Sequence, residues 1–90
     1  MSLFRDNAAL QRYELDAPEG QSIAEYRDVA GVRAILHVET PDTARGRGYA
    51  SKLMAAIVED ARANGRTLRP SCSFAVAYFR RHADAGDVLA

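Results

Sequence analysis

The segment with the clearest chemical potential is Arg45-Gly46-Arg47-Gly48-Tyr49-Ala50, which lies between an expected strand and an expected helix. The first backbone amides of a helix have no partners within it and carry the positive end of its dipole, so they can bind phosphate oxygens. Glycine lets the backbone approach a ligand closely, and arginine adds charge that pairs with phosphate. The segment therefore indicates an anion-binding loop, although an ordinary turn with solvated arginines would use the same residues.

Two common phosphate motifs do not match this loop. A Walker A loop ends in Gly-Lys-Ser/Thr, and Lys52 lacks both of the required neighbours. The Rossmann fingerprint needs Gly or Ala where this chain has Ser51, and an acidic residue on a following strand, which 67–70 does not contain. The loop is thus predicted to bind phosphate in some other context.

Two further side chains could take part in chemistry. His37 stands near the end of the strand that leads into the loop, and imidazole can accept a proton at neutral pH. Cys72 stands just before a second expected helix, whose dipole would favour a nucleophilic thiolate. A histidine that fills a sheet face and a cysteine that fills a small core space are equally ordinary. The residues alone leave both interpretations open.

The first half of the chain predicts antiparallel strands. Alternating segments at 11–15, 21–27 and 32–40 are separated by turn residues at 16–20 and 28–31. On the third strand the alternation places Val32, Ala34, Leu36 and Val38 in one apolar row, with Arg33, Ile35, His37 and Glu39 on the other face.

The second half predicts a crossover unit. A helix is expected over 49–64 with Gly65 as its C-cap, then a short strand at 67–70. A second helix over 73–82, capped by Ser71 or Ser73, would be followed by a tail at 84–90. The expected fold is a single α+β domain over 1–90, with an antiparallel meander, a β-α-β crossover carrying the phosphate loop, and a closing C-terminal helix.

Composition excludes several classes of partner. Twelve Lys+Arg balance twelve Asp+Glu, which argues against capture of nucleic acid or an anionic membrane. No apolar run approaches the ~20 residues of a membrane span, and the first residues lack a signal-peptide pattern. One cysteine and two histidines match no metal-ligand spacing and allow no internal disulfide. We expect a cytoplasmic domain without metal, as a monomer or a weak homodimer formed at a sheet edge.

Segment 45–50 resembles the Arg/Gln-x-x-Gly-x-Gly/Ala signature of the GNAT-type N-acetyltransferase superfamily, whose loop holds the pyrophosphate of acetyl-coenzyme A. The surrounding strand, long helix, strand and helix are also similar, so the resemblance covers roughly 32–82. It implies a compact GNAT-like fold with acetyl-coenzyme A as co-substrate. The coenzyme-binding residues that it implies are Val38, Thr40, Arg45, Gly46, Arg47, Gly48, Tyr49, Ala50 and Ser51.

Segment 70–74, Pro70-Ser71-Cys72-Ser73-Phe74, together with Tyr78 and His82, resembles a small single-domain branch of that superfamily. The branch carries a histidine at the place of His37 that has been proposed as catalytic. Its members often lack an assigned acceptor. We expect Tyr78 and His82 to be structural, because aromatic side chains on a helix usually pack in the core.

Ordinary members of the superfamily carry Asn-x-x-Ala-x-x-x-Tyr on the last helix, with the tyrosine often acting as the acid. On this chain the pattern falls on Cys72, Ala75 and Phe79, and phenylalanine has no proton to give. The resemblance therefore implies a reaction centre of His37 and Cys72. Either Cys72 protonates the departing coenzyme thiolate, or, as we favour, it attacks the thioester and carries the acetyl group, with His37 as base.

The resulting hypothesis is an acetyltransferase that moves an acetyl group to an unidentified acceptor, expected to be a small-molecule or peptide amine. The alternative is a non-catalytic module that binds acyl-coenzyme A or a protein. The small size of the chain favours this alternative, because the missing flanking elements normally build the acceptor pocket.

Overall fold

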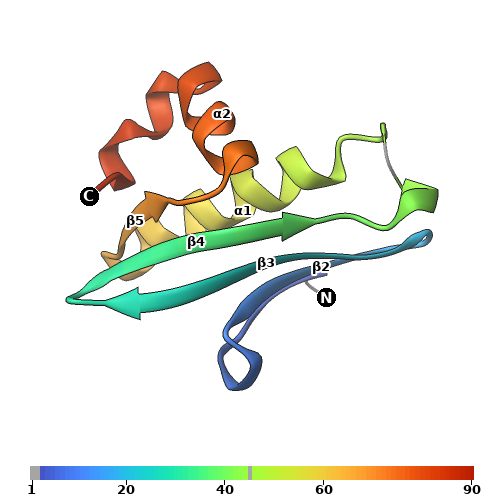
Figure 1. The fold of residues 1–90 in the computed structure, drawn as a ribbon, viewed down its shortest axis with the longest axis horizontal. Helices are drawn as coiled ribbons and strands as arrows, with labels where there is room; N and C mark the ends of the chain where they lie inside the picture. Colours follow the sequence, from blue (N-terminus) through green and yellow to red (C-terminus); the bar gives the residue numbers. More distant parts are fainter. Residues whose placement is uncertain (1–2, 45) are drawn as a thin grey trace.

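The strands form one sheet in sequence order. The computed structural model describes residues 3–44 and 46–90 and has a five-stranded sheet with the order β1-β2-β3-β4-β5 (Figure 1). Neighbouring strands are antiparallel except β4 and β5, which are parallel. The strands are β1 (Phe4–Asn7), β2 (Arg12–Ala17), β3 (Gly20–Val29), β4 (Val32–Glu39) and β5 (Thr67–Pro70). The predicted α+β meander with a crossover is confirmed, and β1 is an additional strand.

Helix α1 (Tyr49–Asn64) makes the crossover between the parallel strands and has the predicted bounds. Its C-cap is Gly65, which takes the left-handed conformation that glycine tolerates best, with φ 63°. The apolar face of the helix is buried, as its 3.6-residue period requires. The buried residues are Leu53, Met54, Ile57, Val58 and Ala61.

A β-bulge in β4 changes the face that each residue of this strand occupies. Tyr26 pairs with Ile35 and Glu25 pairs with His37, so Leu36 is an extra residue on β4. One inserted residue reverses the alternation beyond it. Ile35 therefore faces the core before the bulge and Val38 faces it after the bulge. The predicted apolar row of Val32, Ala34, Leu36 and Val38 was therefore wrong. Val38 shares the core face with Ile35, and Leu36 is 42% exposed.

The C-terminal residues are structured and close the core. Helix α2 (Ser73–Arg81) takes Cys72 as its N-cap, rather than Ser71 or Ser73, and ends one residue earlier than predicted. The 3-10 helix η3 (Ala83–Val88) occupies the expected tail, and its Val88 is buried. Leu89 then forms a bridge with Leu68 of β5. The tail prediction was wrong because these apolar residues cover the end of the core beside β5.

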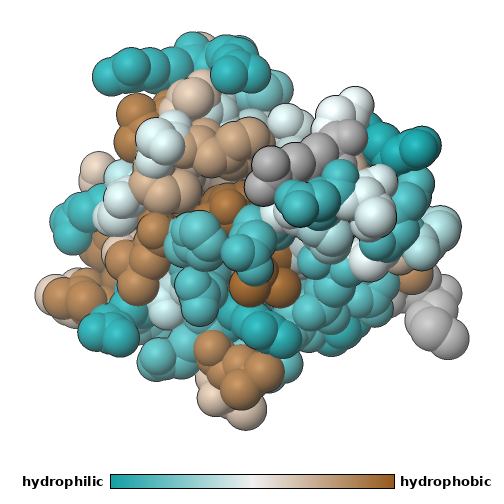
Figure 2. Space-filling view, turned by 45° about the vertical axis from the view of Figure 1, so that its right-hand side comes forward, coloured by the Kyte–Doolittle hydropathy of each residue, from teal (hydrophilic) through white to brown (hydrophobic). Residues whose placement is uncertain are grey.

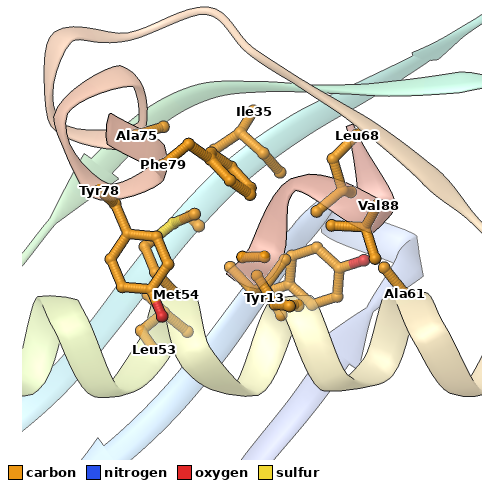
Figure 3. Packing of buried hydrophobic residues seen from close by; sticks show 14 of the residues in the cluster. Tyr13, Ile35, Leu53, Met54, Ala61, Leu68, Ala75, Tyr78, Phe79 and Val88 are labelled. Atoms are coloured by element: carbon orange, nitrogen blue, oxygen red, sulfur yellow. The ribbon is translucent and has the colours of Figure 1, made fainter. Parts of the chain in front are cut away.

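Side chains from all these elements share one core. Tyr78 of α2 lies beside Met54 and Leu53 of α1, while Val88 lies near Leu68 (Figure 3). The opposite face of the sheet carries charged side chains such as Arg5 and Glu14, which form an ion pair. The surface in Figure 2 is mixed, with apolar residues gathered at the upper left and mostly hydrophilic residues at the right. The fold thus buries one sheet face beneath α1, α2 and η3.

A buried charge cluster stabilises the start of β4. Arg33 is only 5% exposed. Its guanidinium donates to both carboxylate oxygens of Asp28, at 2.7 and 2.9 Å, to Asp6 Oδ2 at 2.9 Å, and to the Tyr13 hydroxyl at 2.9 Å. It also lies 3.7 Å from the centre of the Tyr26 ring. Burial raises the pKa of the Tyr13 hydroxyl, and the bond from Arg33 partly offsets that shift.

Candidate functional site

The N-terminus of α1 presents backbone amides without a side-chain cap. Its N-cap is Gly48, which has φ 78° and makes no capping hydrogen bond through a side chain. The first intrahelical hydrogen bond is made by the Lys52 amide, which donates to the carbonyl of Gly48 at 3.0 Å. The amides of the first helical turn, Tyr49–Ser51, therefore have no acceptor inside the helix. Together with the positive end of the dipole, they form a local site for an anion.

The two loop glycines are required by backbone conformation. Gly46 has φ 79° and Gly48 has φ 78°, values that a residue with a Cβ rarely adopts. A Cβ built on either of them would meet no atom within 4 Å. The open space beside them leaves room for a ligand to approach the backbone.

A hollow of about 220 Å³ lies against this helix start. It is bounded by the end of β4, the loop, the first turn of α1 and the first turn of α2. Its lining residues are Thr40, Ala44, Gly46, Gly48, Tyr49, Ala50, Ser51 and Phe74. Neither Ala44 nor Phe74 was expected from the sequence. Phe74 could not be predicted, because only the tertiary fold brings α2 to the loop.

The remaining residues expected to bind the coenzyme lie differently. The Arg47 side chain is 61% exposed, and Val38 packs partly buried against the core. Arg45 lies outside the described residues. Thr40 Oγ1 lies 3.2 Å from the buried Ser22 Oγ, which holds the end of β4 to β3.

The turn between β2 and β3 is attached to the loop through Glu19. The Tyr49 hydroxyl donates to Glu19 Oε1 at 2.9 Å, and Arg47 Nε lies 3.3 Å from Glu19 Oε2. The Thr43 hydroxyl donates to the Glu19 carbonyl at 2.9 Å. The hydrogen bond to Glu19 raises the pKa of the Tyr49 hydroxyl, since ionisation of the tyrosine would break it. Sequence reasoning treated Glu19 only as a turn residue, and no local pattern links it to a loop so far along the chain.

His37 lies on the sheet face that points away from the core. It stands opposite Glu25 of β3, its side chain is 55% exposed, and its Nε2 lies 3.6 Å from Glu39 Oε1. The predicted shared face with Glu39 is confirmed. The shared face with Arg33 was wrong, because the bulge lies between the two residues.

Cys72 lies at the junction of β5 and α2. Its Sγ accepts a hydrogen bond from the Ala75 amide at 3.5 Å, and the residue packs half-buried against the core. The Ser71 amide donates to the Ile35 carbonyl at 2.9 Å, which places the start of α2 beside the bulge of β4. The thiol thus belongs to the helical turn that also lines the hollow. Within residues 3–44 and 46–90 no hydrogen bond or ion pair joins Cys72 to His37.

Tyr78, Phe79 and His82 pack together on α2. The Tyr78 ring stacks on His82 at 4.0 Å between centroids and meets Phe79 edge-on at 5.8 Å. His82 Nδ1 lies 2.8 Å from the Tyr78 carbonyl at the end of the helix. Burial raises the pKa of the Tyr78 hydroxyl, which disfavours its ionised form. These contacts agree with the expectation that Tyr78 and His82 are structural.

In the described ranges, no three His, Cys, Asp or Glu side chains group together so as to hold a metal ion. None of the helices described for this chain has the length and apolar character needed to span a membrane.

Comparison with known proteins places this geometry in a family. The family model described as GCN5-related N-acetyl-transferase matches residues 12–88. A solution structure of a GCN5-like protein from Staphylococcus aureus, described as a candidate N-acetyltransferase, superposes with a TM-score of 0.74 and 27% identity over 100% of this chain and 91% of that one. No curated protein matches the sequence. Because the family model covers most of the chain and the solved structure shares its fold, the chain belongs to the GCN5-related N-acetyltransferase family.

Proposed function

We propose that the chain binds acetyl-coenzyme A at the start of α1 and transfers its acetyl group to an amine. The observation that carries this proposal is the uncapped N-terminus of α1, which opens onto the hollow of about 220 Å³. Its donor set suits a diphosphate: first-turn amides that have no acceptor inside the helix, the positive end of a 16-residue helix and the nearby Arg47 guanidinium. Gly46, Gly48, Tyr49, Ala50 and Ser51 would hold the phosphates.

Cys72 is the proposed carrier of the acetyl group. Its thiolate attacks the thioester carbonyl, forming one carbon–sulfur bond while the bond to the coenzyme sulfur breaks and that sulfur leaves as thiolate. The acceptor nitrogen then attacks the cysteine thioester and displaces Cys72. The proton lost by the nitrogen passes through water to His37, on the outward face. The position of Cys72 supports this role, because it is the N-cap of α2, the helix whose first turn lines the hollow.

Direct transfer is the competing route. Both substrates would then bind together, and Cys72 would protonate the departing coenzyme sulfur. Intact mass after mixing the chain with acetyl-coenzyme A separates the two routes. We expect the mass of one acetyl group to be added to the native chain and not to Cys72→Ser. Loss of turnover in Cys72→Ser without any acetylated native chain would instead favour direct transfer.

A binding module is the second candidate function. The observation that favours it is that His37 and Cys72 make separate contacts, one on the outward sheet face and one against the core. Calorimetric titration with coenzyme A tests binding for both candidates. Release of free coenzyme thiol in the presence of a panel of amines then separates them, because a module binds without turnover. For either function we propose a reducing cytoplasmic location, which would keep the Cys72 thiol free.

A further inference from the structure

The turn between β2 and β3 carries a carboxylate into the surroundings of the anion site. Glu19 accepts from Tyr49, which lines the hollow, and pairs with Arg47, which precedes the helix N-cap. The Glu19 side chain is only 23% exposed, so the carboxylate is held against the loop and does not project freely into solvent.

Two further contacts hold this turn in place. The Thr43 hydroxyl donates to the Glu19 carbonyl, so the turn is tied to the loop on both sides of the glycines. Gly20 packs on Pro41 so closely that an added Cβ would lie 2.9 Å from Pro41 Cγ. The position of the Glu19 carboxylate is therefore set by the packing of its backbone as well as by its own ion pair.

We propose that Glu19 is a positioning residue that pairs with Arg47 in the absence of ligand and releases it to a phosphate of the coenzyme. This inference rests on the proposed function. An exposed arginine that makes two hydrogen bonds to a phosphate is bound more strongly than one that pairs with a single carboxylate oxygen at 3.3 Å. The exchange of Glu19 for a phosphate as the partner of Arg47 is therefore favourable. Glu19 lowers the affinity for phosphate by competing for Arg47, while its hydrogen bond from Tyr49 keeps the loop in position.

Glu19→Gln is the variant that separates these two roles. Glutamine keeps an oxygen that can accept from Tyr49, but it removes the charge that pairs with Arg47. Affinity for coenzyme A, measured by calorimetric titration, should rise about two- to fivefold, the range of one exposed ion pair. The affinity should also fall more steeply with added salt, because Arg47 is then free to pair with phosphate.

Two other variants make the test specific. In an Arg47→Gln background, Glu19→Gln should have no effect on affinity, since the cation that it releases is absent. Glu59→Gln is the matched control: Glu59 also pairs with an arginine, at 2.5 Å from Arg62, but on an exposed part of α1 outside the hollow. Its affinity for coenzyme A should equal that of the native chain. Pantetheine, which has no phosphate, should bind the native chain and Glu19→Gln equally.

The outcomes are distinct. Unchanged or weaker binding of coenzyme A to Glu19→Gln overturns the inference while leaving the proposed function intact. A gain that persists without Arg47 also overturns it, because the charge of Glu19 would then act on the ligand directly. If neither the native chain nor Glu19→Gln binds coenzyme A, the proposed function fails, and this inference fails with it.

Discussion

The two ends of β4 carry arginines in opposite situations. Arg33, at the start of the strand, is buried and makes hydrogen bonds to two carboxylates and a tyrosine. Arg47, in the loop after the end of the strand, is 61% exposed and, within the described residues, its ion pair is with Glu19 at 3.3 Å. At the first end the protein itself supplies the partners of the guanidinium. At the second, the helix amides and the arginine keep bonding capacity for something outside the chain.

This difference separates a structural charge from a functional one. A buried ion pair that is broken leaves an uncompensated charge, so it is costly to lose whatever it contributes to stability. An exposed pair contributes little to stability and can exchange partners at small cost. We therefore expect substitutions at the Arg33 end to change stability and substitutions at the loop end to change binding.

The largest effect is expected from Arg33→Met. It leaves Asp6 and Asp28 without their cation and the buried Tyr13 hydroxyl without its donor. The free energy of unfolding should fall by about 3 kcal/mol. Urea unfolding followed by circular dichroism measures it. A loss below about 1 kcal/mol would mean that the charge cluster around Arg33 contributes little to stability.

The next largest effect, a loss of affinity for coenzyme A, is expected from Ser51→Glu. Ser51 lines the hollow in the first turn of α1. A carboxylate there would accept from the first-turn amides that have no acceptor inside the helix, and it would repel phosphate. Affinity for coenzyme A should fall at least about tenfold, which corresponds to about 1.4 kcal/mol, while stability rises by about 0.5 kcal/mol. Ala55→Glu, one turn further along on the exposed side, is the control and should bind as the native chain does. Equal losses in both variants would contradict an anion site at the helix start.

Asp28→Asn tests the buried cluster by its dependence on pH. The hydrogen bond from Arg33 lowers the pKa of Asp28 below its ordinary value of 3.8. The stabilisation is therefore present above the unfolded pKa and is lost as the pH falls through the lower folded pKa. Asp28→Asn should cost under about 1 kcal/mol at pH 7 and make stability less dependent on pH below about 4. Thermal unfolding at pH 2 to 7 measures this, with the exposed Asp84→Asn as control. If stability fell as steeply at low pH in Asp28→Asn as in the native chain, the stabilising pair of Asp28 and Arg33 would be contradicted.

The smallest effect on stability is expected from Arg47→Gln. Because the Arg47 side chain is mostly exposed and lies as far as 3.3 Å from Glu19, the free energy of unfolding should change by less than about 0.5 kcal/mol. Denaturant unfolding of this variant beside Arg33→Met gives the direct contrast between the two ends of β4. A large destabilisation by Arg47→Gln would show that the loop end is also structural.

Local patterns were sufficient to predict α1 and its surroundings. The apolar period from Leu53 to Ala61 and the glycine after Asn64 define the helix within the segment itself. The strand on each side and the parallel pairing follow from the length of that crossover. The loop glycines could be recognised for the same reason, because positive φ and a helix start are local requirements.

The errors concern contacts between distant residues. Nothing local in 32–40 indicates that Leu36 is an extra residue, since the bulge is defined by pairing with β3. The role of Val88 depends on an uncovered part of the core beside Leu68, which exists only after the sheet has formed. Arg33 appeared to lie on an outer face, although it is buried among aspartates and tyrosines from other strands.

By itself the sequence determined the helix, the glycine loop and the order of the elements, because backbone preference and apolar period act between residues close in the chain. Tertiary structure alone decided that Phe74 lines the same hollow as the loop, that Glu19 reaches Arg47, and that His37 and Cys72 lie on different sides of β4. The physical reason is that register and packing join residues that are far apart in sequence, and a one-residue bulge is enough to exchange the faces of a strand.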